Sequence, residues 1–431
     1  MTTSYTEYKN SGSQWLGNIP SSWETGVIGS LYSQRSTKVS DNDYPPLSVT
    51  MRGVLPQLDT VAKTDAHDAR KLVLKGDFAI NSRSDRRGSC GISDYDGSVS
   101  LINTVLEPRG KMNPQYYNWL FHTVQFADEY YRNGHGIVDD LWTTRWDEMK
   151  RIVIPVPPEL EQAVIAGFLK KKVGAIDAVI SETRASIEEY KAWKASIIFE
   201  AVTKGLDPNV EMKDSGVKWL GTVPQHWTVS RLKTVVAYIE SGVSVNASQS
   251  AASEGKIGVL KTSSVSKYVF NPTENKEVNS DELNRVACQV RANTIIVSRM
   301  NTPELVGACG YVEKDYPLLF LPDRLWQVHF VDSVSVKYVY YYLCSNYIKN
   351  YYASLSSGTS SSMQNISQGQ FLNAAVLLPE RVEQEDVVEF LDKKCADIDT
   401  MILEKESLIS DLESYKRSLI FEVVTGKRRV C

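Results

Sequence analysis

The chain has 431 residues, of which 42% are hydrophobic and 23% charged, and a formal net charge of -4 at pH 7. These fractions are those of an ordinary globular protein with enough apolar residues for two or three domains, and they exclude bulk disorder. No apolar run reaches the roughly 20 residues that a membrane-spanning helix needs. The cysteines show no Cys-x-x-Cys spacing, so we expect a reducing, cytoplasmic location and no zinc site.

The sequence contains the same frame twice. Residues 9–23 read KNSGSQWLGNIPSSW, and residues 213–227 read KDSGVKWLGTVPQHW. A second, ungapped match relates residues 157–203 to residues 379–425, where the pairs Glu-Gln, Phe-Leu, Lys-Lys, Ile-Asp and Val-Thr recur in the same order. Repetition of the frame around two divergent segments predicts one scaffold that presents two different specificities.

The first variable segment has the composition of a mixed α+β domain. Strands are predicted at residues 78–81, 98–107 and 151–156, which are rich in β-branched and apolar residues. A helix is predicted over residues 114–131, with Tyr117, Leu120, Phe121, Val124 and Phe126 as core. The helix leads into a polar loop at residues 131–140, which is suited to recognition or simply to solvent.

The helical block that follows carries an apolar stripe with alternating steps of three and four residues. Such a stripe is typical of a coiled-coil seam. A glycine, Gly205, lies just past it, where helices commonly stop. The stripe residues that we expect at a helix or subunit interface are Ile176, Ile180, Ile187, Tyr190 and Ile197.

The second variable segment repeats this order. Strands are predicted at residues 294–298 and 325–330, a helix over residues 336–353, and a polar loop at residues 354–365. The distal helical block again carries a seam, whose expected interface residues are Ile398, Ile402, Ile409, Leu412 and Leu419.

Each seam covers only about four heptads, so each helix needs a partner, and the obvious partner is its own repeat. The predicted fold class is therefore α+β: two globular domains joined by two long helices that form an antiparallel coiled coil, with a pseudo-two-fold internal repeat. The expected divisions are an arm and first domain (1–155), a central helical spacer (156–212), a second arm and domain (213–378), and a distal helical spacer (379–431).

The sequence carries no catalytic signature. We find no Gly-x-x-x-x-Gly-Lys-Ser/Thr loop, no Gly-x-Gly-x-x-Gly after a strand, and no His-Glu-x-x-His, and the five histidines form no metal-binding pattern. Residues 113–116 (NPQY) loosely resemble the Asn-Pro-Pro-Tyr motif of amino-methyltransferases, but an Asn-Pro turn at a helix start is the simpler interpretation. A non-catalytic binding protein without its own cofactor or metal is expected.

Candidate DNA-binding side chains gather after strands and around the two polar loops. Arginine, asparagine and glutamine can read base edges, while hydroxyl groups can hold phosphates. The repeat of GDFAINSR (76–83) as ANTIIVSR (292–299) aligns Arg83 with Arg299. The candidates in the first segment are Arg83, Arg86, Arg87, Arg132, His135 and Arg145, and those in the second are Arg299, Ser357, Thr359, Gln364 and Asn365.

The repeated arm SGxxWLGxxPxxW, the Pro-x-x-x-Glu-Gln helix starts and the Val-Thr helix ends resemble the specificity subunit of type I restriction–modification enzymes, over essentially the whole chain. The resemblance implies that each variable segment is a target recognition domain that reads one half of a split, asymmetric DNA site. It also implies that the helices dock two modification subunits, which bind S-adenosylmethionine and methylate adenines. Restriction subunits that use ATP and Mg would join this core, whereas the chain itself is non-catalytic.

Three alternatives remain open at this point. The chain could serve a methylation-only or phage-defence complex that lacks the nuclease. It could instead be a coiled-coil scaffold whose inserts bind protein. A self-contained methyltransferase is the third, and the missing cofactor loop argues against it.

Overall fold

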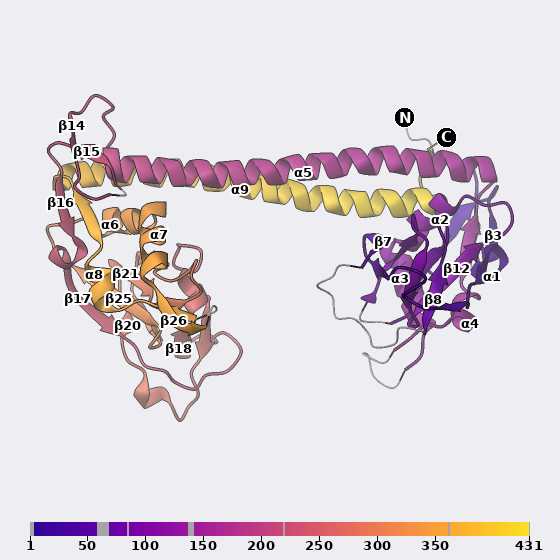
Figure 1. Ribbon diagram of the computed structural model, residues 1–431, viewed down its shortest axis with the longest axis horizontal. Coiled ribbons are helices and arrows are strands. Elements are labelled where there is room, and N and C mark those ends of the chain that lie inside the picture. The colour runs from indigo at the N-terminus through magenta and orange to yellow at the C-terminus, as the bar shows by residue number, and fades with distance from the viewer. Residues whose placement is uncertain are drawn as a thin grey trace. The chain divides into compact units, whose positions relative to one another are not determined.

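The computed structural model describes residues 4–57, 69–83, 86–136, 142–218, 220–360 and 363–430. The chain divides into two compact units, of which unit 1 comprises residues 1–184 and 405–431 and unit 2 comprises residues 185–404. The division passes through two long helices, α5 (Glu159–Lys204) and α9 (Arg381–Val424), so each unit holds a part of both (Figure 1).

Unit 1 is built around an antiparallel four-stranded sheet in the order β10-β9-β12-β4. The predicted strand at 78–81 is β9 (Phe78–Asn81). The remaining strands are β1 (Tyr8–Asn10), β2 (Asn18–Pro20), β3 (Glu24–Val27), β4 (Tyr32–Gln34), β5 (Lys38–Val39), β6 (Leu47–Thr50), β7 (Gly53–Pro56), β8 (Arg70–Val73), β10 (Cys90–Ile92), β11 (Gly97–Ser100), β12 (Asn103–Pro108) and β13 (Val153–Val156).

Two predictions for unit 1 merged elements that are separate. The strand predicted at 98–107 is two strands, because Leu101 and Ile102 form an exposed turn between β11 and β12. The helix predicted over 114–131 is also two helices, because Thr123 caps the second with its hydroxyl, which accepts a hydrogen bond from the Phe126 amide. The helices of this domain are α1 (Ile28–Leu31), α2 (Pro114–Phe121), α3 (Val124–Arg132) and α4 (Trp146–Met149).

Unit 2 repeats this plan with an antiparallel sheet in the order β17-β25-β21-β23. The predicted strands at 294–298 and 325–330 are β21 (Thr294–Ser298) and β25 (Leu325–Phe330). The other strands are β14 (Met212–Asp214), β15 (Thr222–Pro224), β16 (Thr228–Arg231), β17 (Val236–Ser241), β18 (Gly258–Leu260), β19 (Asn275–Glu277), β20 (Gln289–Val290), β22 (Met300–Asn301), β23 (Cys309–Val312), β24 (Tyr316–Phe320), β26 (Ser357–Ser360), β27 (Met363–Asn365) and β28 (Ala375–Leu378).

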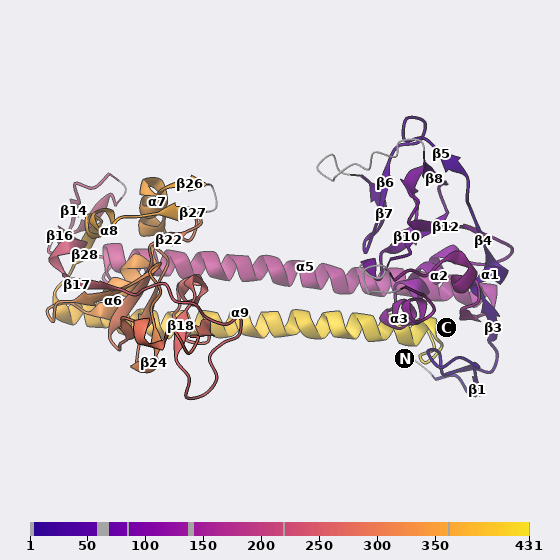
Figure 2. The same ribbon diagram turned by 90° about the horizontal axis from the view of Figure 1, so that it is seen from below.

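The helix predicted over 336–353 is again broken, into α6 (Val336–Leu343) and α7 (Asn346–Leu355). The break at Cys344–Ser345 occupies the same place in unit 2 as the Thr123 cap does in unit 1. The polar loop predicted at 354–365 contains β26 and β27, which lie beside α7 (Figure 2). A short helix, α8 (Gln368–Leu372), and three 3-10 turns, Leu232–Thr234, Thr262–Val265 and Leu283–Arg285, complete the unit.

The duplicated tryptophans anchor each arm to the start of a long helix. Trp23 and Trp227 are fully buried. The indole N–H of Trp23 donates to the Glu161 carboxylate at 3.0 Å, and that of Trp227 donates to Glu383 at the same distance. The repeated Trp and Glu of the sequence therefore form one contact in two copies.

The duplicated glutamines tie the same helix starts to the variable domains. Gln162 accepts a hydrogen bond from the Asn113 amide at 2.9 Å, and Gln384 accepts one from the Ser335 amide at 2.8 Å. The side-chain amide of each also donates to the backbone carbonyl five residues before it. Both glutamines are buried, and these bonds satisfy both ends of their side chains.

Within each unit the long-helix segments pair antiparallel. In unit 1, Lys416 contacts Asp177 at 2.6 Å and Arg184 contacts Glu413 at 2.9 Å, so residue numbers rise on α5 as they fall on α9. In unit 2, Lys194 contacts Asp399 at 2.6 Å. Lys194 and Lys416, which occupy equivalent positions, thus pair with the repeated aspartates across the seam. The expected fold class, an α+β protein with paired long helices and an internal repeat, is confirmed.

The ten expected seam residues lie on shielded faces of the helices. Ile180, Ile187, Ile398 and Leu419 are buried. The others are partly buried, namely Ile176, Tyr190, Ile197, Ile402, Ile409 and Leu412. Among the described residues, no helix is both long and apolar enough to cross a membrane.

Candidate nucleic-acid interface

A short strand edge in unit 1 carries two of the predicted DNA-binding residues. Arg83 forms a β-bridge with Thr143, which also bridges His135. The His135 and Thr143 amides and carbonyls exchange two hydrogen bonds of 2.9 Å, and the Thr144 amide donates to the Ser82 carbonyl at 3.0 Å. The backbone thereby brings Arg83 and His135 together, although 52 positions separate them in the sequence.

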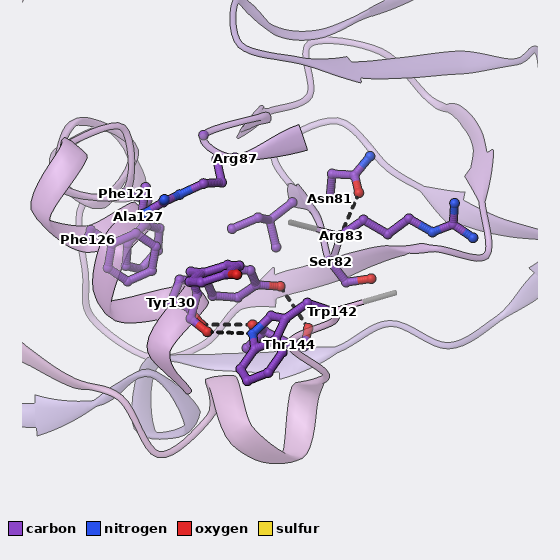
Figure 3. Close-up of a pocket in the computed structure, with 13 residues that line it drawn as sticks. Asn81, Ser82, Arg83, Arg87, Phe121, Phe126, Ala127, Tyr130, Trp142 and Thr144 are labelled. Carbon is purple, nitrogen blue, oxygen red and sulfur yellow. Dashed lines mark hydrogen bonds between the residues drawn. The ribbon is translucent and has the colours of Figure 1, made fainter. Parts of the chain in front are cut away.

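Aromatic side chains support this edge from the domain core. The Tyr130 hydroxyl donates to the Thr144 carbonyl at 2.9 Å, and the Thr144 hydroxyl donates back to the Tyr130 carbonyl at 2.8 Å. Burial raises the pKa of Tyr130, so its hydroxyl remains protonated and able to donate. The Trp142 indole N–H donates to the Tyr131 carbonyl at 2.9 Å. These side chains, with Arg83 and Arg87, line a small cleft (Figure 3).

Close packing also fixes the turn that begins this edge. A Cβ added to Gly134 would lie 2.6 Å from the Trp142 indole nitrogen and 2.7 Å from the Thr144 hydroxyl. A larger residue at Gly134 would therefore displace the strand that carries Thr143.

The corresponding edge in unit 2 is a three-stranded sheet in the order β22-β27-β26. Met300 pairs with Asn365, and Asn365 pairs with Ser357. The Ile366 amide donates to the Arg299 carbonyl at 3.0 Å. The edge therefore collects Arg299, Ser357, Gln364 and Asn365, four of the five predicted residues of this segment. Thr359 belongs to β26, but its side chain lies outside the described residues.

The alignment of Arg83 with Arg299 is wrong by one residue. The Thr144 amide, which follows Thr143, donates to the Ser82 carbonyl, and the Ile366 amide, which follows Asn365, donates to the Arg299 carbonyl. Ser82 is therefore the structural equivalent of Arg299. Arg83 corresponds to Met300, since each pairs with the same position of the next strand. A shift of one residue in a strand moves a side chain to the opposite face, so the two arginines do not occupy equivalent places.

Several other predicted residues of unit 1 are engaged within the domain. Arg87 forms an ion pair with Asp128, and its guanidinium lies 4.8 Å from the Tyr131 ring centroid. Arg132 contacts Glu129 at 2.7 Å. His135 lies 3.5 Å from Glu148, a contact that is ionic only when the imidazole is protonated. Arg86 and Arg145 are exposed, and Arg145 precedes α4.

Arg299 of unit 2 is likewise held in place. Its Nε donates to the Asp323 carbonyl at 2.8 Å, and its side chain is partly buried. Arg83, by contrast, is exposed. Of the arginines at the two strand edges, it is therefore the one best placed to reach a ligand.

Two residues of the edge in unit 1 were missed, Thr143 and Trp142. When the ungapped alignment of residues 157–203 with residues 379–425 is continued towards the N-terminus, it pairs Thr143 with Asn365 and His135 with Ser357. Extending that match would have identified Thr143. Nothing in the sequence identifies Trp142, because its role depends on the turn at Gly134.

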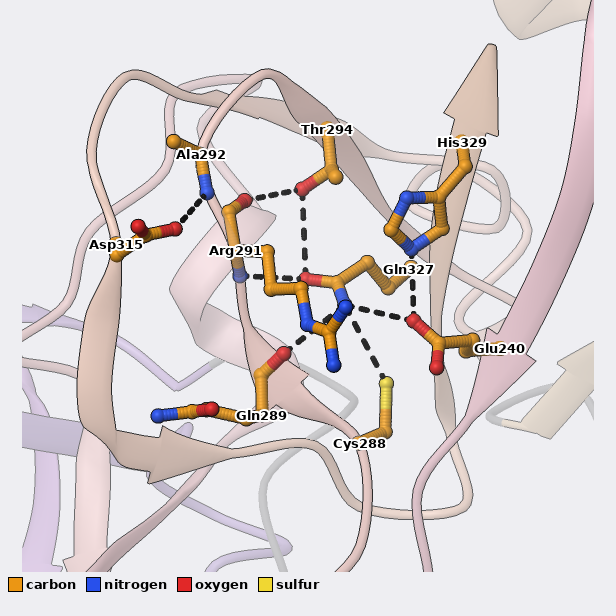
Figure 4. A network of polar contacts seen from close by, with 9 residues as sticks. All are labelled: Glu240, Cys288, Gln289, Arg291, Ala292, Thr294, Asp315, Gln327 and His329. Atoms are coloured by element: carbon orange, nitrogen blue, oxygen red, sulfur yellow. Dashed lines mark hydrogen bonds and ion pairs between the residues drawn. The ribbon is translucent and has the colours of Figure 1, made fainter.

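A buried polar network locks the sheet that leads into the edge of unit 2 (Figure 4). Gln327 on β25 is fully buried; its oxygen accepts from the Arg291 amide at 2.9 Å. Its nitrogen donates to the Gln289 carbonyl at 3.0 Å and to Glu240 at 3.2 Å. Glu240 also contacts His329 at 2.7 Å. One side chain thus joins β25 to β17 and β20.

Replacement of Gln327 by leucine is expected to lower the free energy of unfolding by about 1–3 kcal/mol, because it removes the hydrogen bonds that this fully buried side chain makes to the Arg291 amide and the Gln289 carbonyl. Chemical denaturation followed by circular dichroism measures the change. Gln225→Leu is the matched control, since Gln225 is exposed. Equal stability of the two variants would contradict a stabilising role for the network.

The chain resembles proteins whose function is known. Residues 224–408 match the model of the type I restriction modification DNA specificity domain. The specificity subunit of the Escherichia coli type I restriction enzyme EcoEI is 28% identical over 172 residues, which cover 39% of this chain and 29% of that subunit. The EcoKI specificity subunit of Escherichia coli K12 is 24% identical over 286 residues, 64% of this chain and 58% of that subunit. The chain thus matches less than two thirds of either relative's length.

Solved structures share the fold over nearly the whole chain. A chain from a study of complex assembly in the type I R-M system superposes with a TM-score of 0.69 at 15% identity, covering 94% of this chain and 98% of that one. The HsdS subunit of Thermoanaerobacter tengcongensis gives a TM-score of 0.52 at 16% identity, with coverages of 95% and 98%. The fold is the one seen in these solved chains. Residues 224–408 match a type I restriction modification DNA specificity domain, and the chain is similar in sequence to specificity subunits of type I restriction enzymes.

Proposed function

We propose that the chain reads a bipartite, asymmetric DNA site, with one half-site for each unit. One observation carries the proposal: the two units place a strand edge at the same point of the same frame, but with different side chains. His135 and Thr143 of unit 1 stand where unit 2 has Ser357 and Asn365. Side chains that differ in donors and acceptors distinguish different base pairs in the major groove.

We further propose that the paired helices fix the separation of the half-sites and dock two modification subunits. The chemistry would lie in the partners: S-adenosylmethionine for adenine methylation in the modification subunits, and ATP with Mg in restriction subunits. In this proposal the chain supplies recognition alone. Its net charge of -4 fits a complex in which the partners contribute much of the positive surface that DNA binding requires.

Selection from a random duplex library by the complex of this chain with its modification subunit tests the proposal. Recovered DNA should contain two short, different sequences separated by an unread spacer of fixed length. A single continuous sequence, or a palindrome, would contradict the assignment of one half-site to each unit.

Two alternatives differ in what they predict. A methylation-only or phage-defence complex would select the same kind of DNA but would show no ATP-dependent cleavage with any subunit encoded beside it. A coiled-coil scaffold whose inserts bind protein would select no DNA sequence at all. The chemical difference between the two edges favours DNA recognition over the scaffold.

A further inference from the structure

Most residues that recur in the two helical blocks are explained by contacts within the chain. Glu161 and Glu383 bind the tryptophans of the arms. The repeated glutamines bind backbone groups, and the repeated aspartates pair with lysines across the seam. The repeated Thr203 donates within its own helix at 2.6 Å. Intramolecular structure therefore accounts for their presence in both copies.

Two repeated lysine pairs have no such explanation. Lys171 and Lys172 on α5 recur as Lys393 and Lys394 on α9, and all four are exposed. Among the described residues, none of the four has a hydrogen bond, ion pair or ring contact. The neighbouring position is not repeated, because Lys170 in unit 1 corresponds to Asp392 in unit 2. The pairs have stayed alike on surfaces that otherwise differ in charge.

The first lysine of each pair points away from the domain of its unit. The buried face of α5 includes Leu169 and Val173, which are two positions from Lys171 on either side. At 3.6 residues per turn, Lys171 projects from the opposite face of the helix. The same geometry applies to Lys393, which lies two positions from both Leu391 and Cys395, also buried.

An exposed apolar residue shares this outer face in both units. Leu160 is 86% exposed and Val382, at the equivalent position, is 69% exposed. Each lies 11 positions before the first lysine, about three helical turns, and therefore on the same side of its helix. Both units therefore expose an apolar side chain at the same position of this outer face.

We propose that Leu160 with Lys171 and Lys172, and Val382 with Lys393 and Lys394, form two equivalent docking patches, each of which binds one copy of the modification subunit through an acidic surface with an apolar contact. This inference rests on the proposed function and names the residues of its partner interface. Because the lysine pair recurs and an apolar residue precedes it at the same spacing in both units, one partner surface fits both patches. The lysine ammonium groups require carboxylates opposite them for complementarity.

DNA does not fit these patches as well as protein does. The strand edges that would read bases belong to the domains that cover the buried faces of α5 and α9. The helix therefore lies between Lys171 and the domain that carries the edge of its unit, and the same holds for Lys393. Phosphates also offer no counterpart for Leu160 and Val382.

The test uses the full chain and its modification subunit, with native mass spectrometry to count bound copies. The wild-type chain should bind two copies. The double variant Lys171→Glu, Lys172→Glu should bind one copy, and so should the double variant Lys393→Glu, Lys394→Glu. The variant with all four substitutions should bind no copy. Each reversed pair should weaken binding at its own patch on the order of 100-fold, because like charges then face each other. The matching double alanine variants should show the same order with smaller losses.

Lys170→Asp is the matched control and should retain both copies, because unit 2 already has Asp392 at that position. Thermal unfolding of every variant should match the wild type, since none of the four lysines has a hydrogen bond, ion pair or ring contact among the described residues. If the quadruple variant still bound two copies, the proposed docking patches would be contradicted and the proposed function would remain intact. Loss of DNA affinity with two copies still bound would assign the lysines to phosphates instead. A folded wild-type chain that binds no copy would refute the proposed function, and the patches with it.

Discussion

Trp23→Ala is expected to lower the free energy of unfolding by about 3–5 kcal/mol, the range for truncation of a large, fully buried aromatic residue. The indole is fully buried, donates to Glu161 at 3.0 Å, and lies edge-on to Tyr116 at 6.5 Å between ring centroids. It also packs against Gly426, where an added Cβ would be 3.1 Å from the ring. Its loss would separate the arm from the start of α5 and the end of α9. Urea denaturation followed by far-ultraviolet circular dichroism measures the effect.

Trp193→Ala is the matched control for this substitution, because Trp193 is 50% exposed on α5. Its effect should be within about 1 kcal/mol, as for most surface substitutions. If Trp23→Ala were equally mild, the arm would not be an essential part of the unit 1 core.

Arg83→Ala should weaken the binding of the complex to its DNA site by about 10–100-fold, the loss that accompanies one good base contact. The loss should concern one half-site only, because Arg83 belongs to the edge of unit 1. Competition binding with duplexes altered in one half or in the other measures this. The variant should lose its discrimination against changes in one half and retain it in the other.

Arg109→Ala is the control for Arg83. Both arginines are exposed in unit 1, but β12 runs between them: Asn103 at one end pairs with Asn81 near Arg83, and Arg109 follows the other end. Its removal should leave affinity and specificity unchanged. A uniform loss of affinity with Arg83→Ala, without a change in sequence preference, would indicate a phosphate contact instead of base reading.

The sequence predicted the frame well because its signals are local and occur twice. The strands β9, β21 and β25 match their predicted bounds, since buried runs of apolar residues stand out in any window. The breaks at Thr123 and Ser345 were missed because each interrupts an apolar pattern that continues in phase on both sides. A single capping hydroxyl decides the break at Thr123, and such a cap is visible only once the geometry is known.

The candidate site was predicted in composition but not in register. The polar loops and Arg83 were identified, whereas the equivalence with Arg299 was wrong because a match of eight residues with only three identities tolerates a slip of one. Backbone geometry resolves it: Gly76 and Asn293 both have positive φ, 94° and 54°, and they precede the equivalent strands β9 and β21. Thr143 was missed because its place depends on pairing with a residue distant in sequence.

Mapping of methylated adenines by long-read sequencing tests the central claim most directly. A host without other modification activity would express this chain with its cognate modification subunit, either as the wild type or with His135→Ser and Thr143→Asn, the residues of unit 2. The wild type should methylate a two-part motif with a fixed unread gap, and omission of this chain should abolish it. The variant should change or lose specificity in one part and keep the other part and the gap. A motif that changes in both parts, or that persists without this chain, would contradict recognition of one half-site by each unit.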